Sequence, residues 1–353
     1  MTHPERRLEA PHRRLESSPR LVEKAAVIGY KATAAALAHL PPPLSREVIG
    51  GFSQLGYLVL PSKRRWSNRN FGHVLGLPPD HPRVRRMALR AYKEYATYMV
   101  ELMRLPSRPK DEVSSLVEGE GIDRIIDGWK DSGKAAIVVA GHVGNNEAVA
   151  AAIAWRGLPA NVVADDSSFP EIFEILRRQR ESWGVHVVPW RNLRELFKIL
   201  RNNEMLALLV DWGYRSDGIP VKLFGAWTTL PAGPATLAAK TGAVIAFMAV
   251  RRTTDGHFHI DADEVFGVPS SRPADLQLAT QRIADSLERT IAAAPEQWYS
   301  FKPIWPATAD EAIDLERRAL EMQAGRRDPG PNTGIARDPA DQASAADRPD
   351  DRA

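Results

Sequence analysis

Short apolar runs rich in Val and Ile recur through the middle of the chain. They lie at 135–140, 161–164, 185–188, 205–210 and 243–250, with a further one at 257–260. Segments with helical spacing separate or follow them, at about 146–156, 170–183, 192–203, 232–241 and 273–293. Strand–helix alternation of this kind predicts an α/β fold, with a central, largely parallel sheet flanked by helices.

The N-terminal third has a different pattern. Residues 21–105 carry helical spacing, and 21–40 is an apolar segment interrupted by three charges. A second apolar patch, 47–60, is followed directly by Lys63, Arg64, Arg65 and Trp66. Apolar residues beside cations and a tryptophan suit a bilayer interface, although ordinary core helices have a similar pattern. This predicts an N-terminal helical membrane-associating region, and the absence of an uncharged run of membrane-spanning length predicts no transmembrane helix.

These patterns divide the chain into four parts. We expect a disordered basic tail over 1–19, the helical region over 20–110 and the α/β core over 111–308. The stretch 309–353 is expected to hold a short helix and then a disordered tail, because large apolar residues almost disappear from about residue 324 onward.

Charge and composition narrow the function. Residues 1–110 contain 20 Lys and Arg against 8 Asp and Glu, while the whole chain has a net charge of only +3. A basic surface of this kind favours polyanions such as anionic lipid, nucleic acid or a phosphorylated cosubstrate. The chain has no cysteine, which excludes disulfides, thiolate metal sites and a cysteine nucleophile. The first twenty residues lack the apolar segment of a signal peptide.

The sharpest chemical feature is the segment Gly141-His142-Val143-Gly144-Asn145-Asn146-Glu147, which follows the first core strand and precedes a helix. Functional groups gather at the carboxyl ends of strands in such sheets. His142 has a side chain suited to general-base catalysis, and Glu147 is a carboxylate that could orient its ring. By spacing alone, a chance His–Glu pair near a helix start is the better explanation of the pattern.

Other chemistry has less support. His257, His259, Asp261 and Asp263 alternate as one face of a strand, and we expect an exposed strand there and no metal site. Neither a G-x-G-x-x-G segment, a P-loop nor a G-x-S-x-G elbow is present.

The segment G-H-x-G-N-x-E resembles the active-site motif of the bacterial lysophospholipid-acyltransferase-like superfamily. The branch that it resembles contains the lipid A late acyltransferases and the phosphatidylinositol mannoside acyltransferases. Further matches follow in order over roughly residues 60–305: Asp165, Arg180, Asp211, the segments 220–225 and 231–234, and Pro295-Glu296-Gln297-Trp298. The chain departs from the branch at Trp212 and Gly213, where an Arg or His and then an acidic residue are common.

The resemblance implies an acyltransferase at the cytoplasmic face of the plasma membrane, bound peripherally. His142, Glu147 and Asp165 would be catalytic, and Arg180, Asp211 and Asn145 would bind substrate. His142 would take the proton of a lipid hydroxyl that attacks the thioester of acyl-CoA or acyl carrier protein, which serve as cosubstrates, and no cofactor is expected. Arg180 would face the developing oxyanion or a donor phosphate.

The acceptor is the least determined part. A membrane glycolipid of the phosphatidylinositol mannoside type is favoured over lipid A, and nucleic acid is not expected as a partner. Two other classes stay open: a non-catalytic protein that binds anionic lipid or nucleic acid through the basic region, and a hydrolase that directs the same base at water.

Overall fold

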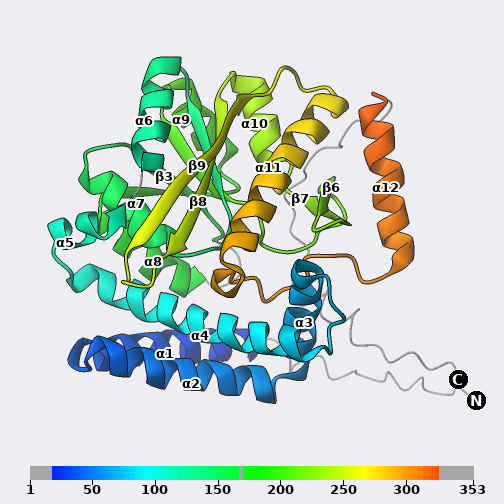
Figure 1. Cartoon of the computed structure of the whole chain (residues 1–353). Helices are drawn as coiled ribbons and strands as arrows, with labels where there is room; N and C mark the ends of the chain where they lie inside the picture. The colour runs from blue at the N-terminus through cyan, green and yellow to red at the C-terminus, as the bar shows by residue number, and fades with distance from the viewer. Residues whose placement is uncertain (1–17, 119, 167–169, 326–353) are drawn as a thin grey trace, which may run out of the picture.

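The computed structural model describes residues 18–118, 120–166 and 170–325, and its centre is a seven-stranded sheet (Figure 1). The strands of this sheet, in spatial order, are β1 (Val117–Glu118), β9 (Phe258–Gly267), β8 (Val244–Arg252), β2 (Ala136–Ala140), β5 (Met205–Leu209), β3 (Ala160–Ala164) and β4 (Val185–Pro189). All neighbours are parallel except β8 and β9, which are antiparallel. The predicted α/β fold with a mostly parallel sheet is confirmed.

Helices cover both faces of this sheet and its carboxyl edge. They are α1 (Ser18–His39), α2 (Pro42–Val59), α3 (Pro61–Leu75), α4 (Pro82–Arg104), α5 (Lys110–Ser115), α6 (Glu120–Ser132), α7 (Asn146–Trp155), α8 (Pro170–Ser182), α9 (Leu193–Arg201), α10 (Gly233–Thr241), α11 (Pro273–Ala293) and α12 (Ala309–Gln323), with two short 3-10 turns at Leu105–Ser107 and Pro295–Gln297.

The apolar run of β2 supplies the core on both faces, since all five of its residues are buried. Alternate side chains of a strand point to opposite faces. Ile137 and Val139 pack in the large cluster that includes apolar residues of α9, α10 and α11. Ala136, Val138 and Ala140 pack on the other side with α6 and α7. Burial on both faces explains why this strand is continuously apolar and does not alternate.

The N-terminal helices form a layer beneath the sheet (Figure 1), where α4 contacts α1, α2 and α3. Arg252, the last residue of β8, makes ion pairs with Glu94 and Glu101 of α4. Because β8 and β2 are parallel, α4 lies near the end of the sheet at which β2 also finishes. In the described part of the chain, no helix combines the length and the apolarity needed to cross a bilayer.

Three strands were not expected: β1 and the two strands of segment 219–230. Segment 219–230 forms a separate antiparallel hairpin of β6 (Ile219–Leu223) and β7 (Ala226–Leu230), which packs against α11 and α12. Phe224 and Gly225 turn the chain with φ of 49° and 73°. Two positive φ values in a two-residue loop are typical of a type I′ turn, but phenylalanine is uncommon in that conformation, so the sequence gives a weak turn signal.

Two expectations concern the ends of the chain. The disordered segments predicted over 1–19 and beyond residue 324 lie mostly outside the described residues, although Ser18 and Pro19 belong to α1. The domain boundaries expected at residues 110 and 308 stay predictions.

Candidate active site

His142 lies two residues beyond the end of β2, in a loop held close to neighbouring backbone. Its carbonyl accepts a hydrogen bond from the backbone N–H of Tyr299. Gly144 has a φ of +67°, and a Cβ there would come within 2.7 Å of the Val250 carbonyl oxygen. Only glycine combines that conformation with so close an approach. The glycine therefore fixes the path of the loop that carries His142.

The carboxylate beside the His142 ring is that of Asp211. Its Oδ1 lies 2.6 Å from Nδ1 of His142, and both carboxylate oxygens lie 3.0 Å from the His142 backbone nitrogen. The indole Nε1 of Trp298 donates to Oδ2 at 2.8 Å. The Asp211 side chain has no solvent exposure, against 26% for His142. The acid is thus fixed from three sides inside the protein while the imidazole reaches the surface.

Two opposing effects act on the pKa of Asp211. Burial alone would raise it, but His142 and the Trp298 indole lower it below its ordinary value, so the group is a carboxylate at neutral pH. An ionised carboxylate next to Nδ1 holds the proton of a neutral imidazole on that nitrogen. Nε2 is then the basic nitrogen.

Glu147 does not occupy the position expected for it beside the histidine. It lies in the first turn of α7, and its carboxylate pairs with Arg180 of α8, whose Nε donates to Oε2 at 2.9 Å. Burial alone would lower the pKa of Arg180, and Glu147 raises it above its ordinary value. The expectation that Glu147 orients His142 is therefore corrected, because Asp211 makes that contact.

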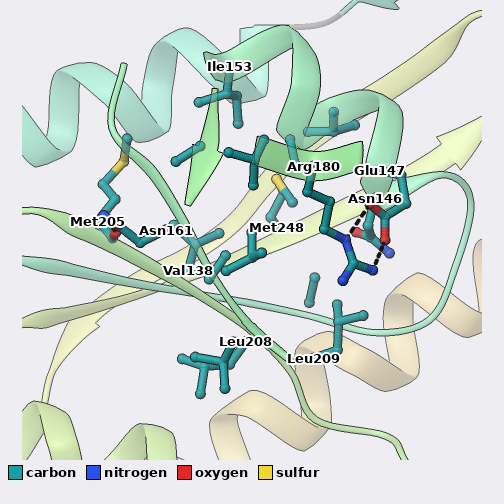
Figure 2. A pocket seen from close by; sticks show the side chains of 18 of the residues that line it. Val138, Asn146, Glu147, Ile153, Asn161, Arg180, Met205, Leu208, Leu209 and Met248 are labelled. Atoms are coloured by element: carbon teal, nitrogen blue, oxygen red, sulfur yellow. Dashed lines mark hydrogen bonds and ion pairs between the residues drawn. The ribbon is translucent and has the colours of Figure 1, made fainter. Parts of the chain in front are cut away.

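An apolar cavity runs from the Glu147–Arg180 pair along β2, β3 and β5 (Figure 2). The space between its walls is about 850 Å³ when the open solvent at its mouth is counted, so the enclosed part is smaller. Besides that pair and two asparagines, Asn146 and Asn161, its walls are apolar, and they include Val138, Val149, Ile153, Val163, Ala207 and Met248. Figure 2 shows the ion pair at one end and Met205 with Asn161 at the other. A single charged end on a long apolar space suits a ligand with a polar head and a hydrocarbon chain.

Asn145 is not available to a substrate, contrary to expectation. The residue is only 1% exposed. Its Oδ1 accepts the backbone N–H of Ala148 and so caps α7, and its Nδ2 donates to Glu101 at 3.0 Å. Both polar ends of the side chain are used inside the protein. Asn145 therefore links the active-site helix to the α4–β8 ion pairs.

The remaining expected site residues are Asp165, Arg180 and Asp211. Asp165 is exposed just beyond the end of β3 and makes an electrostatic contribution at Lys302. Its catalytic role stays a prediction, as does contact of Arg180 with substrate. Asp211 was expected to bind substrate, and its complete burial against His142 corrects that expectation.

Sequence reasoning missed two tryptophans. Trp298 was noted within a motif but given no role, and it is the indole donor to Asp211. Trp212 was noted only as a departure, and its ring centroid lies 5.6 Å from that of His142. The sequence did contain one indication of Trp298, since the residue belongs to the segment Pro295-Glu296-Gln297-Trp298, which matches the family motif and follows the helix at 273–293.

A mostly parallel sheet, a histidine–carboxylate pair at its carboxyl edge and an apolar cavity lined by Ala140 and Asn146, on either side of the histidine in the chain, are compatible with an enzyme that acts on a substrate with a hydrocarbon chain. Comparison with known proteins identifies its family. Residues 18–306 match the model of the bacterial lipid A biosynthesis acyltransferases, and the chain belongs to this family. It is an acyltransferase.

Two similar proteins are named as phosphatidylinositol mannoside acyltransferases. The chain is 27% identical over 300 residues to a phosphatidylinositol mannoside acyltransferase of Mycolicibacterium smegmatis, an alignment that covers 83% of this chain and 94% of the relative. It is also 27% identical over 262 residues to the phosphatidylinositol mannoside acyltransferase of Mycobacterium tuberculosis strain CDC 1551, covering 71% and 80% of the two chains. The expected branch is thus confirmed.

Proposed function

We propose that the protein transfers a fatty acyl group from acyl-CoA, or from acyl carrier protein, to a hydroxyl of a membrane glycolipid of the phosphatidylinositol mannoside type. The observation that carries the proposal is the His142–Asp211 pair together with an apolar cavity lined by Ala140 and Asn146, which lie on either side of His142 in the chain. The two mycobacterial relatives support the choice of acceptor. The location at the cytoplasmic face of the plasma membrane stays a prediction.

The chemistry needs no enzyme nucleophile. Nε2 of His142 takes the proton of the acceptor hydroxyl as that oxygen attacks the thioester carbonyl, and the imidazolium that forms lies against the Asp211 carboxylate. The C–S bond then breaks, and the thiolate leaves with a proton from His142. General-base catalysis contributes about 10²–10⁴-fold, and positioning and oxyanion stabilisation supply the remainder.

The acyl chain is assigned to the apolar cavity. Each methylene that moves from water into such a space contributes about 0.8 kcal/mol, so the depth of the cavity selects chain length. Arg180 stands at the charged end and stays protonated through its pairing with Glu147. Under this assignment, a cation would stand where the thioester end of the donor enters.

We expect Ala207→Leu to shift the enzyme toward shorter donors. Ala207 lies in β5 on the cavity wall, and a leucine there removes space without adding a polar group. Reactivity should fall about fourfold for each methylene that no longer enters, from ~0.8 kcal/mol per buried CH₂. Relative rates with a series of acyl-CoA lengths measure this, and Ala324→Leu at the exposed end of α12 is the matched control. An unchanged length profile would place the chain elsewhere.

The membrane-facing surface is assigned to α2. Large apolar side chains at helical spacing stand exposed along it: Leu44, Val48, Phe52, Leu55 and Val59, with Leu58 and Leu60 beside them. Lys63, Arg64 and Arg65 follow at the start of α3. An exposed apolar helical face flanked by cations is the pattern of a helix that lies in the interface of an anionic membrane.

Phe52→Asp should weaken binding to vesicles that contain anionic lipid by about ten- to a hundredfold, from ~1.5–3 kcal/mol for one buried aromatic side chain. Phe52 is 68% exposed in α2, and Ile313 of α12 is 64% exposed, so Ile313→Asp is a control of matched exposure. Co-sedimentation with the vesicles measures both. Equal vesicle binding by the two variants would contradict the assignment of α2 as the membrane-facing surface.

A transfer assay tests the function. The purified protein is given labelled acyl-CoA or acyl carrier protein with phosphatidylinositol mannoside, with a lipid A precursor, or with no acceptor. We expect label in the mannoside. Transfer to the lipid A precursor alone would reassign the acceptor. Release of free fatty acid at the same rate without acceptor would make the protein a hydrolase, and no consumption of either donor would leave lipid binding as its activity.

A further inference from the structure

Two lysines, Lys302 and Lys63, stand over the faces of tryptophan rings. Nζ of Lys302 stands 3.8 Å from the ring centroid of Trp212, and Nζ of Lys63 stands 4.5 Å from that of Trp66. In the described part of the chain, neither ammonium group has a hydrogen-bonding or ion-pairing partner, although Asp165 acts on Lys302 from a distance. Trp212 also approaches the His142 ring, with 5.6 Å between centroids. These contacts lead from His142 through Trp212 to Lys302.

Two hydrogen bonds fix the backbone of the segment that carries Lys302. Asn70 of α3 is buried, and its Nδ2 donates to the Lys302 carbonyl at 2.7 Å. Lys63 lies seven residues before Asn70, two helical turns away, and so on the same face of α3. On the other side, Tyr214 donates its backbone N–H to the Pro303 carbonyl at 2.8 Å. The Asn70 bond holds the segment around residue 302 against α3, which carries Lys63, and the charge of Lys63 acts on Lys302.

The surroundings of the two ammonium groups disfavour their positive charge, and a bound anion would favour it. Burial and the nearby charge of Lys63 lower the pKa of Lys302 to about 8, with Asp165 acting in the opposite direction. Burial also lowers the pKa of Lys63. Two partly desolvated cations near each other repel, and a bound anion would offset that cost. A phosphate accepts from several ammonium donors at once.

We propose that Lys302 and Lys63, carried on Trp212 and Trp66, form a phosphate-binding subsite beside the catalytic histidine. The inference rests on the proposed function, because both cosubstrates carry phosphate. One source is the phosphate of the coenzyme A or phosphopantetheine part of the donor. The other is the phosphodiester of the acceptor's lipid headgroup. Either would position a reactant relative to His142.

Direct binding to the full-length protein tests the subsite without turnover. Isothermal titration is carried out with free coenzyme A and with dioctanoyl-phosphatidylinositol below its micelle concentration. Lys302→Met should weaken one of these two ligands by about tenfold or more, because charge-assisted hydrogen bonds are the strong ones. Lys302→Arg should retain most of the affinity. Lys222→Met is the matched control, since Lys222 also stands over a tryptophan, Trp227, but on the exposed hairpin.

The outcomes separate the possibilities. Weaker coenzyme A binding assigns the subsite to the donor, and weaker phosphatidylinositol binding assigns it to the acceptor. Unchanged binding of both in Lys302→Met and in Lys63→Met would overturn the proposal, as would an equal loss in Lys302→Arg and Lys302→Met. A protein that binds through these lysines but transfers no acyl chain would refute the proposed function and keep the subsite. Acyl transfer by the parent protein, with ligand binding unchanged in the lysine variants, would keep the proposed function and refute the subsite.

Discussion

His142→Ala should reduce acyl transfer by about 10²–10⁴-fold, the contribution of a positioned general base. The imidazole is the group whose Nε2 is free to take the hydroxyl proton, because Nδ1 is engaged by Asp211 at 2.6 Å. The side chain is 26% exposed and is not part of the apolar core, so the variant should fold. Transfer rates with saturating donor and acceptor, together with a thermal melt, measure both effects.

His186→Ala is the matched control for this change. His186 is a histidine of β4 whose side chain is 52% exposed and which lies outside the site. Its loss should leave transfer within about twofold of the parent. Retention of full activity by purified His142→Ala would contradict the assignment of the base, whatever the control shows.

Asp211→Asn should also reduce transfer, by about 10²–10⁴-fold, for a reason that differs from loss of the base. The carboxylate accepts from the His142 backbone, from Nδ1 and from Trp298. An asparagine has one acceptor oxygen, and its NH₂ group must face one of these donors. If it faces Nδ1, the imidazole proton moves to Nε2, and the base is lost while the histidine is still present.

The same substitution should lower the free energy of unfolding by about 1–3 kcal/mol, because a buried donor loses its acceptor. Asp217→Asn provides the comparison, since Asp217 is an exposed aspartate paired with Arg215. The pH dependence of the transfer rate distinguishes a defect in the base from misfolding of the variant. Asp211→Asn with parental activity would show that Nδ1 needs no carboxylate, and the proposed catalytic pair would fall.

The sequence predicted the core strands from their Val- and Ile-rich runs, and β2 and β8 carry side chains buried on both faces of the sheet. It did not predict which strands are neighbours, and the partner of His142 was predicted incorrectly for that reason. Glu147 is close to His142 in sequence, but the first turn of α7 carries it toward Arg180 of α8. Proximity along the chain was mistaken for proximity of side chains.

Asp211 could have been found from strand register. Ala140 of β2 pairs with Leu209 of β5, and two residues beyond each of them come His142 and Asp211. Equivalent positions after adjacent parallel strands meet at the same edge of the sheet. The pairing of β2 with β5 depends on tertiary packing between residues 69 positions apart in the chain, so no local pattern contains it. Asn145 was misjudged for a related reason, since its partner Glu101 belongs to α4.

The most direct test of the account is mass spectrometry of membrane lipids from the source organism after deletion of the gene. A phosphatidylinositol mannoside one acyl chain short should accumulate, and its fully acylated form should return with the intact gene but not with one encoding His142→Ala. A lipid profile with every acylated glycolipid unchanged, or full restoration by the His142→Ala gene, would contradict the account.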